Sequence, residues 1–558
     1  MTSLLTSQDT DDRRVPRPRS RAWFGVAGLT ATAAGLGAAE LVGGMWGERA
    51  PSPVVAVAAV FVDRTPGAAV RTGIEVAGRA DKPLLLIAVT VATLALGFTA
   101  ARWSRDRVGR FAAAVAALAA LGLWAQWRQP TANGAASALT SGVGLAVSLG
   151  VGTWMLRRAA SLERATVRAA PSAGPGAPNG GTPEQSPGAP FDVPSPPVAS
   201  PIDPPASRRQ FLTFAGAGAS FAAFGAVAGN RIRSGTGVDR ARAELELPVA
   251  TRTSQVAAGT LDDVAGVTPY LPPSSEFYRI DTALLVPQVD PATWSLTIGG
   301  MVDTKLRFTL DDLLARDLVE VPVTLSCVSN EVGGDLVGNA TWRGIALSEL
   351  LDEAGLDPAA TQIASRSVDG WTCGFPVEAA YDGRNAVVAV AMNGEPLPLE
   401  HGFPARLVVA GLYGYVSATK WLEEIRLTTF EDFTGYWIPR GWSRFGPVKT
   451  QSRIDVPRRG QTPAAGKVAV AGIAWAPTRG IAKVEVQIDD QPWTEARRGT
   501  PVSDETWVQW VHEWDATPGE HRLRVRATDG TGETQTEQRT SVAPDGATGW
   551  HTVEVTVA

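Results

Sequence analysis

A lone cysteine stands where an apolar run ends, a position in which a thiolate could bind a metal. Residues 318–325 alternate like a β-strand, and Cys327 follows directly after this run. The glycine-rich segment beyond it, with Gly333 and Gly334, predicts a loop. A thiolate held at a strand end and facing a loop-lined cavity is a good soft ligand for a heavy transition metal.

The chain has only one other cysteine, so a disulfide framework is not expected. Two cysteines in 558 residues, Cys327 and Cys373, allow at most one bridge. A Cys327–Cys373 bridge therefore stays open as an alternative if this half of the chain is exported. Without such a bridge, Cys373 is expected to be a small buried residue.

The residues around Cys327 resemble a known family. The segment 324–330 (TLSCVSN), with residues 342–347 (WRGIAL) downstream, resembles the molybdenum-ligating segment of the sulfite oxidase family. The resemblance extends over residues 245–558 and implies an α+β molybdopterin domain in which Cys327 binds molybdenum. The other matching segments are residues 277–282 (FYRIDT), 294–300 (WSLTIGG), 401–409 (HGFPARLVV) and 411–421 (GLYGYVSATKW).

The resemblance also implies a set of cofactor-binding residues. A buried phosphate dianion needs cations and backbone N–H groups, and Arg279, Arg406 and Lys420 supply the cations. Two alternatives stay open: Arg406 as a structural ion-pair partner, and Lys420 as a solvated strand end. The implied cofactor-binding residues are Tyr278, Arg279, Asp281, Thr282, Cys327, Asn330, His401, Arg406, Tyr415, Ser417, Thr419 and Lys420.

The expected reaction is a two-electron oxygen-atom transfer, and the substrate is left open. Sulfite oxidases of plants and animals have an arginine directly after the Cys-x-x-Asn segment, where this chain has Glu331. Sulfite-like oxidation and the reduction of an S- or N-oxide are both compatible with that change. By the resemblance, Tyr436 is a candidate proton donor and Arg440 a candidate substrate clamp, unless these residues only line a domain interface. The competing hypothesis is an inactive exported binding or assembly protein that keeps the fold.

The first part of the chain predicts a four-helix transmembrane unit, residues 22–157. Each of four apolar stretches approaches the length needed to span a bilayer, whereas residues 53–62 are too short. Arginines flank the stretches so that both ends of the unit face the cytoplasm. Glu40, inside the first stretch, is either functional or bound to the interface or to a neighbouring helix. The four stretches are residues 22–46, 83–101, 111–127 and 134–156.

A second targeting signal is predicted in the middle of the chain. Residues 207–212 (SRRQFL) come before a mildly apolar run and resemble a twin-arginine export signal. A fifth transmembrane helix over residues 207–231 would place the remaining chain on the extracytoplasmic side. Alternatively, Arg208 and Arg209 only flank an ordinary helix. Residues 226–228 (AVA) offer a cleavage site.

The composition limits cofactors and partners. All four histidines lie after residue 400 and no C-x-x-C-H segment occurs, so no haem is expected and electrons would pass to a separate partner. A net charge of -5 and the lack of a basic run disfavour nucleic acid. A small-molecule substrate and membrane lipid are the other expected partners.

The predicted architecture has several domains. An all-α transmembrane bundle comes before an α+β sulfite oxidase-like molybdopterin domain, and five alternating strands after residue 467 predict an all-β immunoglobulin-like sandwich. By the resemblance, this last domain would form a homodimer. The predicted parts are a tail (1–21), the four-helix unit (22–157), a Pro/Gly/Ser-rich linker (158–206), the fifth helix (207–231), the molybdopterin domain (245–457) and the sandwich (458–558).

Overall fold

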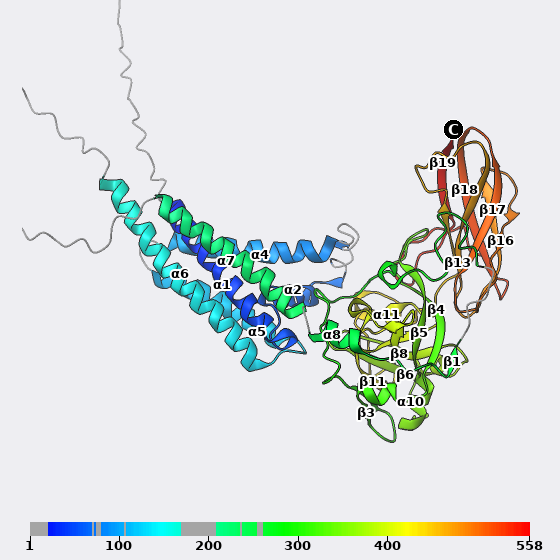
Figure 1. The fold of residues 1–558 in the computed structure, drawn as a ribbon, viewed down its shortest axis with the longest axis horizontal. Helices are drawn as coiled ribbons and strands as arrows, with labels where there is room; N and C mark the ends of the chain where they lie inside the picture. The colour runs from blue at the N-terminus through cyan, green and yellow to red at the C-terminus, as the bar shows by residue number, and fades with distance from the viewer. Residues whose placement is uncertain are drawn as a thin grey trace, which may run out of the picture.

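The computed structural model has three parts in a row: a helical unit, a central domain and a C-terminal domain (Figure 1). The helical unit comprises residues 21–168 and 208–234, the central domain residues 237–450, and the C-terminal domain residues 451–558. The predicted tail, most of the linker and Ser207 lie outside the described residues. The structure describes residues 21–67, 69, 72–73, 80–104, 108–168, 208–234, 237–253 and 260–558.

The helical unit contains the predicted apolar helices. Within the described residues, five helices are long and apolar enough to cross a membrane, and α2 is too short. The fourth predicted stretch extends beyond residue 156 to Arg168. The helices are α1 (Arg21–Gly44), α2 (Pro53–Arg64), α4 (Asp81–Trp103), α5 (Val108–Trp127), α6 (Gly134–Arg168) and α7 (Arg208–Ser234), with a short turn η1 (Gly47–Arg49) after α1.

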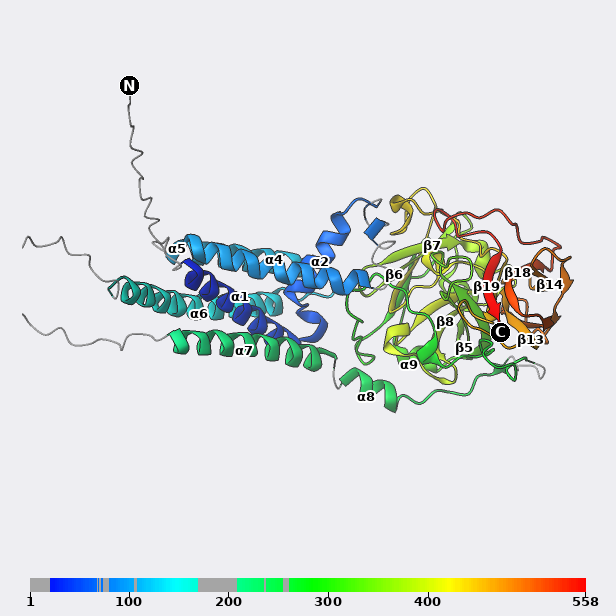
Figure 2. The same cartoon turned by 90° about the horizontal axis from the view of Figure 1, so that it is seen from above.

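Helices α1 and α7 pack closely through small residues. A Cβ atom added at Gly225 would lie 2.3 Å from the carbonyl oxygen of Gly37. One added at Gly229 would lie 2.1 Å from the carbonyl oxygen of Glu40. Only glycine allows the two backbones to approach this closely, as in many helix pairs within membranes. Helix α7 begins at the far end of the bundle and ends beside the central domain (Figures 1 and 2).

Glu40 is bound to a neighbouring helix, which is one of the alternatives predicted for it. Its carboxylate lies 3.4 Å from the Arg233 guanidinium of α7 and accepts a hydrogen bond from Ser52 Oγ. The side chains of Glu40 and Arg233 are both largely buried. The ion pair therefore joins α1 to the last turn of α7.

The central domain is built on two sheets. Their strands share one large core, which also receives Trp475 and Trp507 from the C-terminal domain. The first sheet has the order β1 (Arg252–Thr253), β4 (Val319–Ser326), β5 (Val337–Ala346), β8 (Ala386–Met392) and β10 (Arg406–Val409), with β9 (Glu395–Pro396) paired to β8. The second has the order β3 (Leu306–Phe308), β2 (Leu296–Gly300), β11 (Leu422–Thr428), β6 (Gln362–Ser367) and β7 (Thr372–Pro376).

Short helices connect these strands. In the first turn of α9, Thr309 and Asp312 form a reciprocal capping box, which fixes the start of the helix. The α-helices are α8 (Gly237–Glu244), α9 (Leu310–Leu314), α10 (Leu347–Ala354) and α11 (Gly414–Ser417). The 3-10 turns are η3 (Ser274–Glu276), η4 (Val377–Ala380), η5 (Leu399–His401) and η6 (Ile438–Arg440).

The predicted strand before Cys327 is confirmed as β4. It pairs with β5 in antiparallel register, Ser326 opposite Val337, so residues 327–336 form the hairpin loop that begins with Cys327. Of the other segments that match the family, residues 277–282 lie in a loop outside the strands. Residues 294–300 contain β2, which begins at Leu296.

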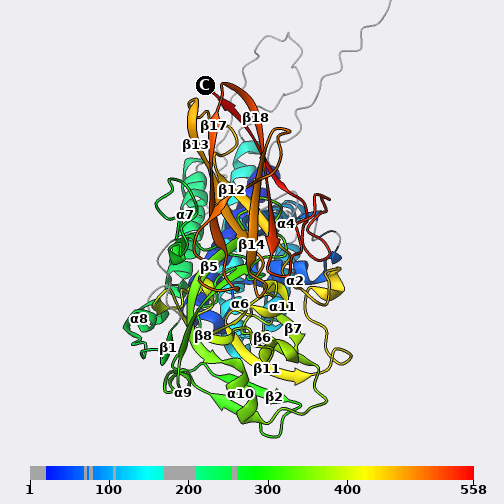
Figure 3. The same cartoon turned by 90° about the vertical axis from the view of Figure 1, so that its right-hand side faces the viewer.

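The C-terminal domain consists of two four-stranded sheets packed around a common core. Figure 3 shows its strands extending together toward the C-terminus. All five predicted strands are present, and β12 precedes the predicted boundary at residue 458. One sheet has the order β12 (Gln451–Val456), β13 (Gly466–Trp475), β17 (Val508–Ala516) and β16 (Arg497–Arg498). The other has the order β15 (Thr494–Glu495), β14 (Ile481–Ile488), β18 (Gly519–Asp529) and β19 (His551–Val557).

A loop of the C-terminal domain is hydrogen-bonded to the strand that carries Cys327. The Thr324 amide of β4 donates to the Glu505 carbonyl at 3.0 Å, and the Trp507 amide donates to Thr324 Oγ1 at 2.7 Å. The buried Glu505 carboxylate accepts two hydrogen bonds from Asn385, at 2.7 Å from its amide and 2.6 Å from Nδ2. These bonds join the two domains close to the end of β4.

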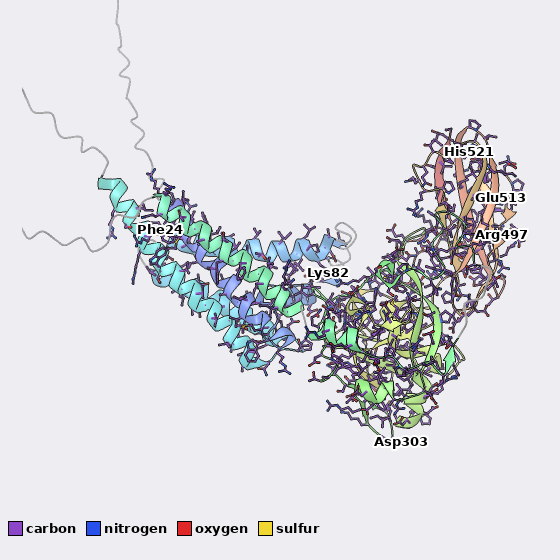
Figure 4. The ribbon with its side chains drawn as sticks, viewed as in Figure 1. Phe24, Lys82, Asp303, Arg497, Glu513 and His521 are labelled. Carbon is purple, nitrogen blue, oxygen red and sulfur yellow. The ribbon has the colours of Figure 1, made fainter. Side chains whose placement is uncertain are left out.

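Removing the Glu505 carboxylate should weaken this domain contact. In Glu505→Ala the Asn385 donors lose their acceptor, and the free energy of unfolding should fall by about 1–3 kcal/mol. Urea unfolding followed by tryptophan fluorescence measures the change. The control is Glu513→Ala, because Glu513 is exposed on the surface of the C-terminal domain (Figure 4). Equal stability of the two variants would contradict the role of Glu505.

Candidate functional site

Cys327 is held at the start of a rigidly hydrogen-bonded loop. Its amide donates to the Leu336 carbonyl at 2.9 Å, which continues the β4–β5 ladder by one residue. The Asn330 amide donates to the Cys327 carbonyl at 3.0 Å, and Asn330 Oδ1 accepts from the Leu336 amide at 2.8 Å. The Asn330 side chain therefore supports the loop from inside. Cys327 itself is only 9% exposed.

The Cys327 thiol lies among polar groups of the central domain. Burial raises its pKa, and hydrogen bonds from Ser329 and the charge of Lys420 offset only part of this rise. Tyr278 and Tyr413 lie close enough for their phenol groups to interact electrostatically with Cys327. The free thiol is therefore protonated near neutral pH, and a bound metal would have to displace its proton.

The other cysteine, Cys373, does not pair with Cys327. Both residues are buried free thiols, so the predicted alternative of a disulfide is wrong. Cys373 Sγ lies 3.1 Å from Thr419 Oγ1 and 3.3 Å from Ser365 Oγ. Cys373 is a small buried residue, as predicted.

Arg406 is a buried cation without an acidic partner. Its side chain is only 4% exposed, and its guanidinium carbon lies 4.9 Å from the ring centroid of Trp342. Nη1 donates to the His401 carbonyl at 3.1 Å. Burial lowers the pKa of Arg406 to about 10. In the part of the chain that the structure describes, Arg406 forms no ion pair, so the alternative of a structural ion-pair partner is wrong.

His401 carries a buried nitrogen that has no hydrogen-bond partner. Its Nε2 lies 3.1 Å from the Ser274 carbonyl, whereas Nδ1 is buried and unbonded among the described residues. Burial, followed by the charges of Lys420 and Arg406, lowers the pKa of His401 to about 3. The ring is thus neutral and could bind a further polar group through Nδ1. Together with the unpaired Arg406, this nitrogen fits a site for an anionic, hydrogen-bonding cofactor.

A cluster of charges surrounds the buried carboxylate of Asp281. One oxygen lies 2.8 Å from Lys82 Nζ, and the other lies 3.0 Å from Arg279 Nε and 3.1 Å from Lys420 Nζ. Burial alone would raise the pKa of Asp281, but the charges of Lys420, Lys82 and Arg279 outweigh it and hold the pKa below its usual range.

Lys420 is a buried member of this cluster. Burial lowers its pKa to about 8 despite the opposing effect of Asp281. The alternative of a solvated strand end is therefore wrong for Lys420. Lys82 was not predicted as a site residue, because a lysine at the end of an apolar stretch usually marks only the membrane interface.

The predicted hydroxyl groups are mostly occupied by bonds within the protein. Ser417 Oγ donates to the Tyr413 carbonyl at 3.2 Å, and Tyr415 donates to the Ser443 carbonyl at 2.6 Å. Thr419 Oγ1 shares a hydrogen bond with Ser365, at 2.7 Å. Ser417 and Thr419 are buried, and Thr282 is half-buried. These hydroxyls support the walls of the site.

Tyr436 and Arg440 form a second group, beside the helical unit. The Arg440 guanidinium carbon lies 3.6 Å from the ring centroid of Tyr436, and Nη1 donates to the Tyr436 carbonyl at 2.7 Å. Burial raises the pKa of Tyr436. The positive charge of Arg440 lowers this pKa in part, and the negative charge of Asp63 in the helical unit raises it further. A small pocket next to this pair is lined by Cys373, Trp437 and other residues.

The carboxyl of Asp369 interacts electrostatically with both groups. Burial raises its pKa, and the charges of both Asp281 and Lys82 act on it. Asp369 in turn acts on the pKa of Tyr436. The Asp281 cluster and the Tyr436–Arg440 pair are therefore electrostatic neighbours. Sequence patterns gave no signal for Asp369.

Glu331, the residue directly after Asn330, is exposed.

Comparisons with known proteins agree with this site. The family described as "Oxidoreductase molybdopterin binding domain" matches residues 283–437. The mitochondrial sulfite oxidase of Macaca fascicularis is 29% identical over 344 residues, which cover 52% of this chain and 62% of that protein. The uncharacterized oxidoreductase YuiH of Bacillus subtilis is 32% identical over 157 residues, covering 28% of this chain and 76% of that protein.

Among solved structures, the sulfane dehydrogenase SoxCD of Paracoccus pantotrophus matches with a TM-score of 0.46 and 23% identity, covering 51% of this chain and 81% of that one. The chain spans 62% of the length of the macaque sulfite oxidase and 55% of the human one. The matched family segment contains Cys327, His401, Arg406 and Lys420. The chain belongs to the molybdopterin-binding oxidoreductases, the family that includes the sulfite oxidases.

Proposed function

We propose that this protein is a membrane-anchored molybdopterin-dependent oxidoreductase that carries out two-electron oxygen-atom transfer on the extracytoplasmic side of the membrane. One observation carries the proposal. The buried Cys327 thiol shares its surroundings with Lys420, and the same region holds the unpaired cation Arg406 and the unbonded Nδ1 of His401. These are the donor types that a thiolate-bound metal and an anionic pterin cofactor require.

Each residue has a defined role in this proposal. Cys327 would bind molybdenum as thiolate, while Arg406 and Lys420 would bind the anionic part of the cofactor. His401 would add a hydrogen bond through Nδ1, since its lowered pKa keeps the ring neutral. The bound cofactor would supply the redox chemistry.

The substrate would be a small molecule bound near Tyr436 and Arg440. Tyr436 keeps its proton at neutral pH because burial raises its pKa, as a proton donor must. Arg440, stacked on the same ring, would position a polar or anionic group of the substrate. The sulfite oxidases among the relatives favour a sulfite-like substrate, and the exposed Glu331 in place of arginine favours an S- or N-oxide instead.

The helical unit would hold the enzyme in the membrane. Five apolar helices support this, as does the twin-arginine segment at the start of α7, which would export the central domain after it has folded. Close packing of α7 on α1 and the Glu40–Arg233 ion pair favour retention of α7 over cleavage at Ala228. Lipid would surround these helices.

Electrons would pass to a separate protein partner, because we expect no haem in this chain. The C-terminal domain, with two four-stranded sheets around a common core, would be an immunoglobulin-like sandwich that forms a homodimer, as the family resemblance implies.

Replacing the metal ligand should remove both the metal and the activity. In Cys327→Ser, the molybdenum content per protein should fall at least a hundredfold, because a serine hydroxyl binds molybdenum poorly in place of a soft thiolate. The rate at which S- and N-oxo substrates are reduced or oxidised should fall by the same factor. Elemental analysis and a redox assay of the purified protein measure the two effects.

The matched control is Cys373→Ser, which changes the other buried thiol and should keep its molybdenum. Wild-type protein that contains neither molybdenum nor pterin, although produced in a host that makes the cofactor, would support the alternative of an inactive binding protein.

The twin-arginine segment should be required for export. In Arg208→Lys combined with Arg209→Lys, the central domain should stay in the cytoplasm, because the export pathway reads the arginine pair. Protease accessibility in spheroplasts shows the location of the domain. The control changes Arg157 and Arg158 of α6 to lysine, where export should persist. Normal export of the Arg208/Arg209 variant would refute the signal.

A further inference from the structure

The helical unit reaches into the charge cluster of the central domain through Lys82. This lysine is the second residue of α4, and Figure 4 shows it where the helical unit meets the central domain. Its Nζ donates to Asp281 Oδ1 at 2.8 Å and to the Ala283 carbonyl at 2.8 Å. The lysine thus holds both ends of the short segment 281–283, directly beside the candidate cofactor site.

Two further contacts bring the same end of the helical unit against the central domain. A Cβ atom added at Gly67, after α2, would lie 2.9 Å from Cα of Arg440. One added at Gly370 would lie 2.7 Å from Cγ of Pro130, in the connection between α5 and α6. Three points of the helical unit, Gly67, Lys82 and Pro130, therefore lie against the central domain, two of them at candidate site residues.

We infer that Lys82 is part of the cofactor pocket, so that the helical unit completes the binding site and is more than an anchor. This inference rests on the proposed function. It assigns to Lys82 a positioning role, exerted through Asp281 and the Ala283 carbonyl.

The charges of the cluster support this inference. Lys82, Arg279 and Lys420 surround one carboxylate, Asp281, which leaves an excess of two positive charges. A phosphate monoester carries close to two negative charges at neutral pH. Without Lys82, Asp281 would draw more strongly on Lys420, and the cluster would keep a single excess positive charge to act beside Arg406. Asp281 and Lys420 are both buried, so this difference is weakly screened by solvent.

The test is the cofactor content of the full-length protein, independent of activity. In Lys82→Gln, the molybdenum and pterin bound per protein after purification and dilution should fall about tenfold, the lower end of what the loss of a supporting residue costs a metal site. Lys82→Arg should keep most of the cofactor because it restores the charge. The control Lys467→Gln removes an exposed lysine that pairs with Asp515 on the C-terminal domain and should change nothing.

A disulfide tests the contact itself in native membranes. The added Cβ at Gly370 lies 3.9 Å from Cβ of Pro130, which suits a disulfide between Pro130→Cys and Gly370→Cys. Gly370 has a φ of +87°, so cysteine is strained there and the variant is assayed only for the bond. The bond should form on mild oxidation and be found by mass spectrometry.

The outcomes separate this inference from the proposed function. If the wild type contains molybdenum and pterin and the Lys82→Gln variant contains as much, the role of the helical unit is overturned and the enzyme assignment stays intact. Failure of the disulfide to form has the same meaning. Loss of cofactor in Lys82→Arg as severe as in Lys82→Gln would also overturn it. Wild-type protein without molybdenum and pterin would overturn the proposed function and, with it, this inference.

Discussion

The buried carboxylate of Asp281 is the interaction on which the rest of the site depends. It binds three cations: the nearby Arg279, and Lys82 and Lys420 from distant parts of the chain. Burying a cation is costly unless an anion lies beside it, and one carboxylate cannot neutralise three. The remaining positive charge, together with the unpaired Arg406, makes the region favourable for an anion. The same carboxylate joins the helical unit to the central domain.

The position of Cys327, the proposed metal ligand, depends on a different constraint, the β4–β5 hairpin. Cys327 continues the ladder by one hydrogen bond, Asn330 supports the loop from inside, and Glu505 of the C-terminal domain fixes the strand from the other side through Thr324. A buried thiol is a weak acid and a weak nucleophile. Burial therefore keeps the free Cys327 thiol unreactive, and the charge of Lys420 would favour the thiolate form that could bind a metal.

Much of this arrangement follows from local sequence patterns. The strand predicted at residues 318–325 and the predicted apolar helices depend on neighbouring residues, and the structure confirms them. Tertiary contacts were beyond such patterns. The ion pair between Lys82 and Asp281 joins residues 199 positions apart. The family resemblance groups Cys327, Arg406 and Lys420 in one cofactor site, which stays a prediction, and it did not reveal that Tyr415 donates its hydroxyl to the backbone.

The central claim is that the Cys327 thiolate binds molybdenum beside the pterin. Molybdenum X-ray absorption spectroscopy of the purified full-length protein tests it most directly, because it counts sulfur neighbours of the metal. The account predicts one sulfur neighbour more than the pterin dithiolene alone can supply, contributed by Cys327. A sulfur count that the pterin dithiolene alone explains would contradict the account.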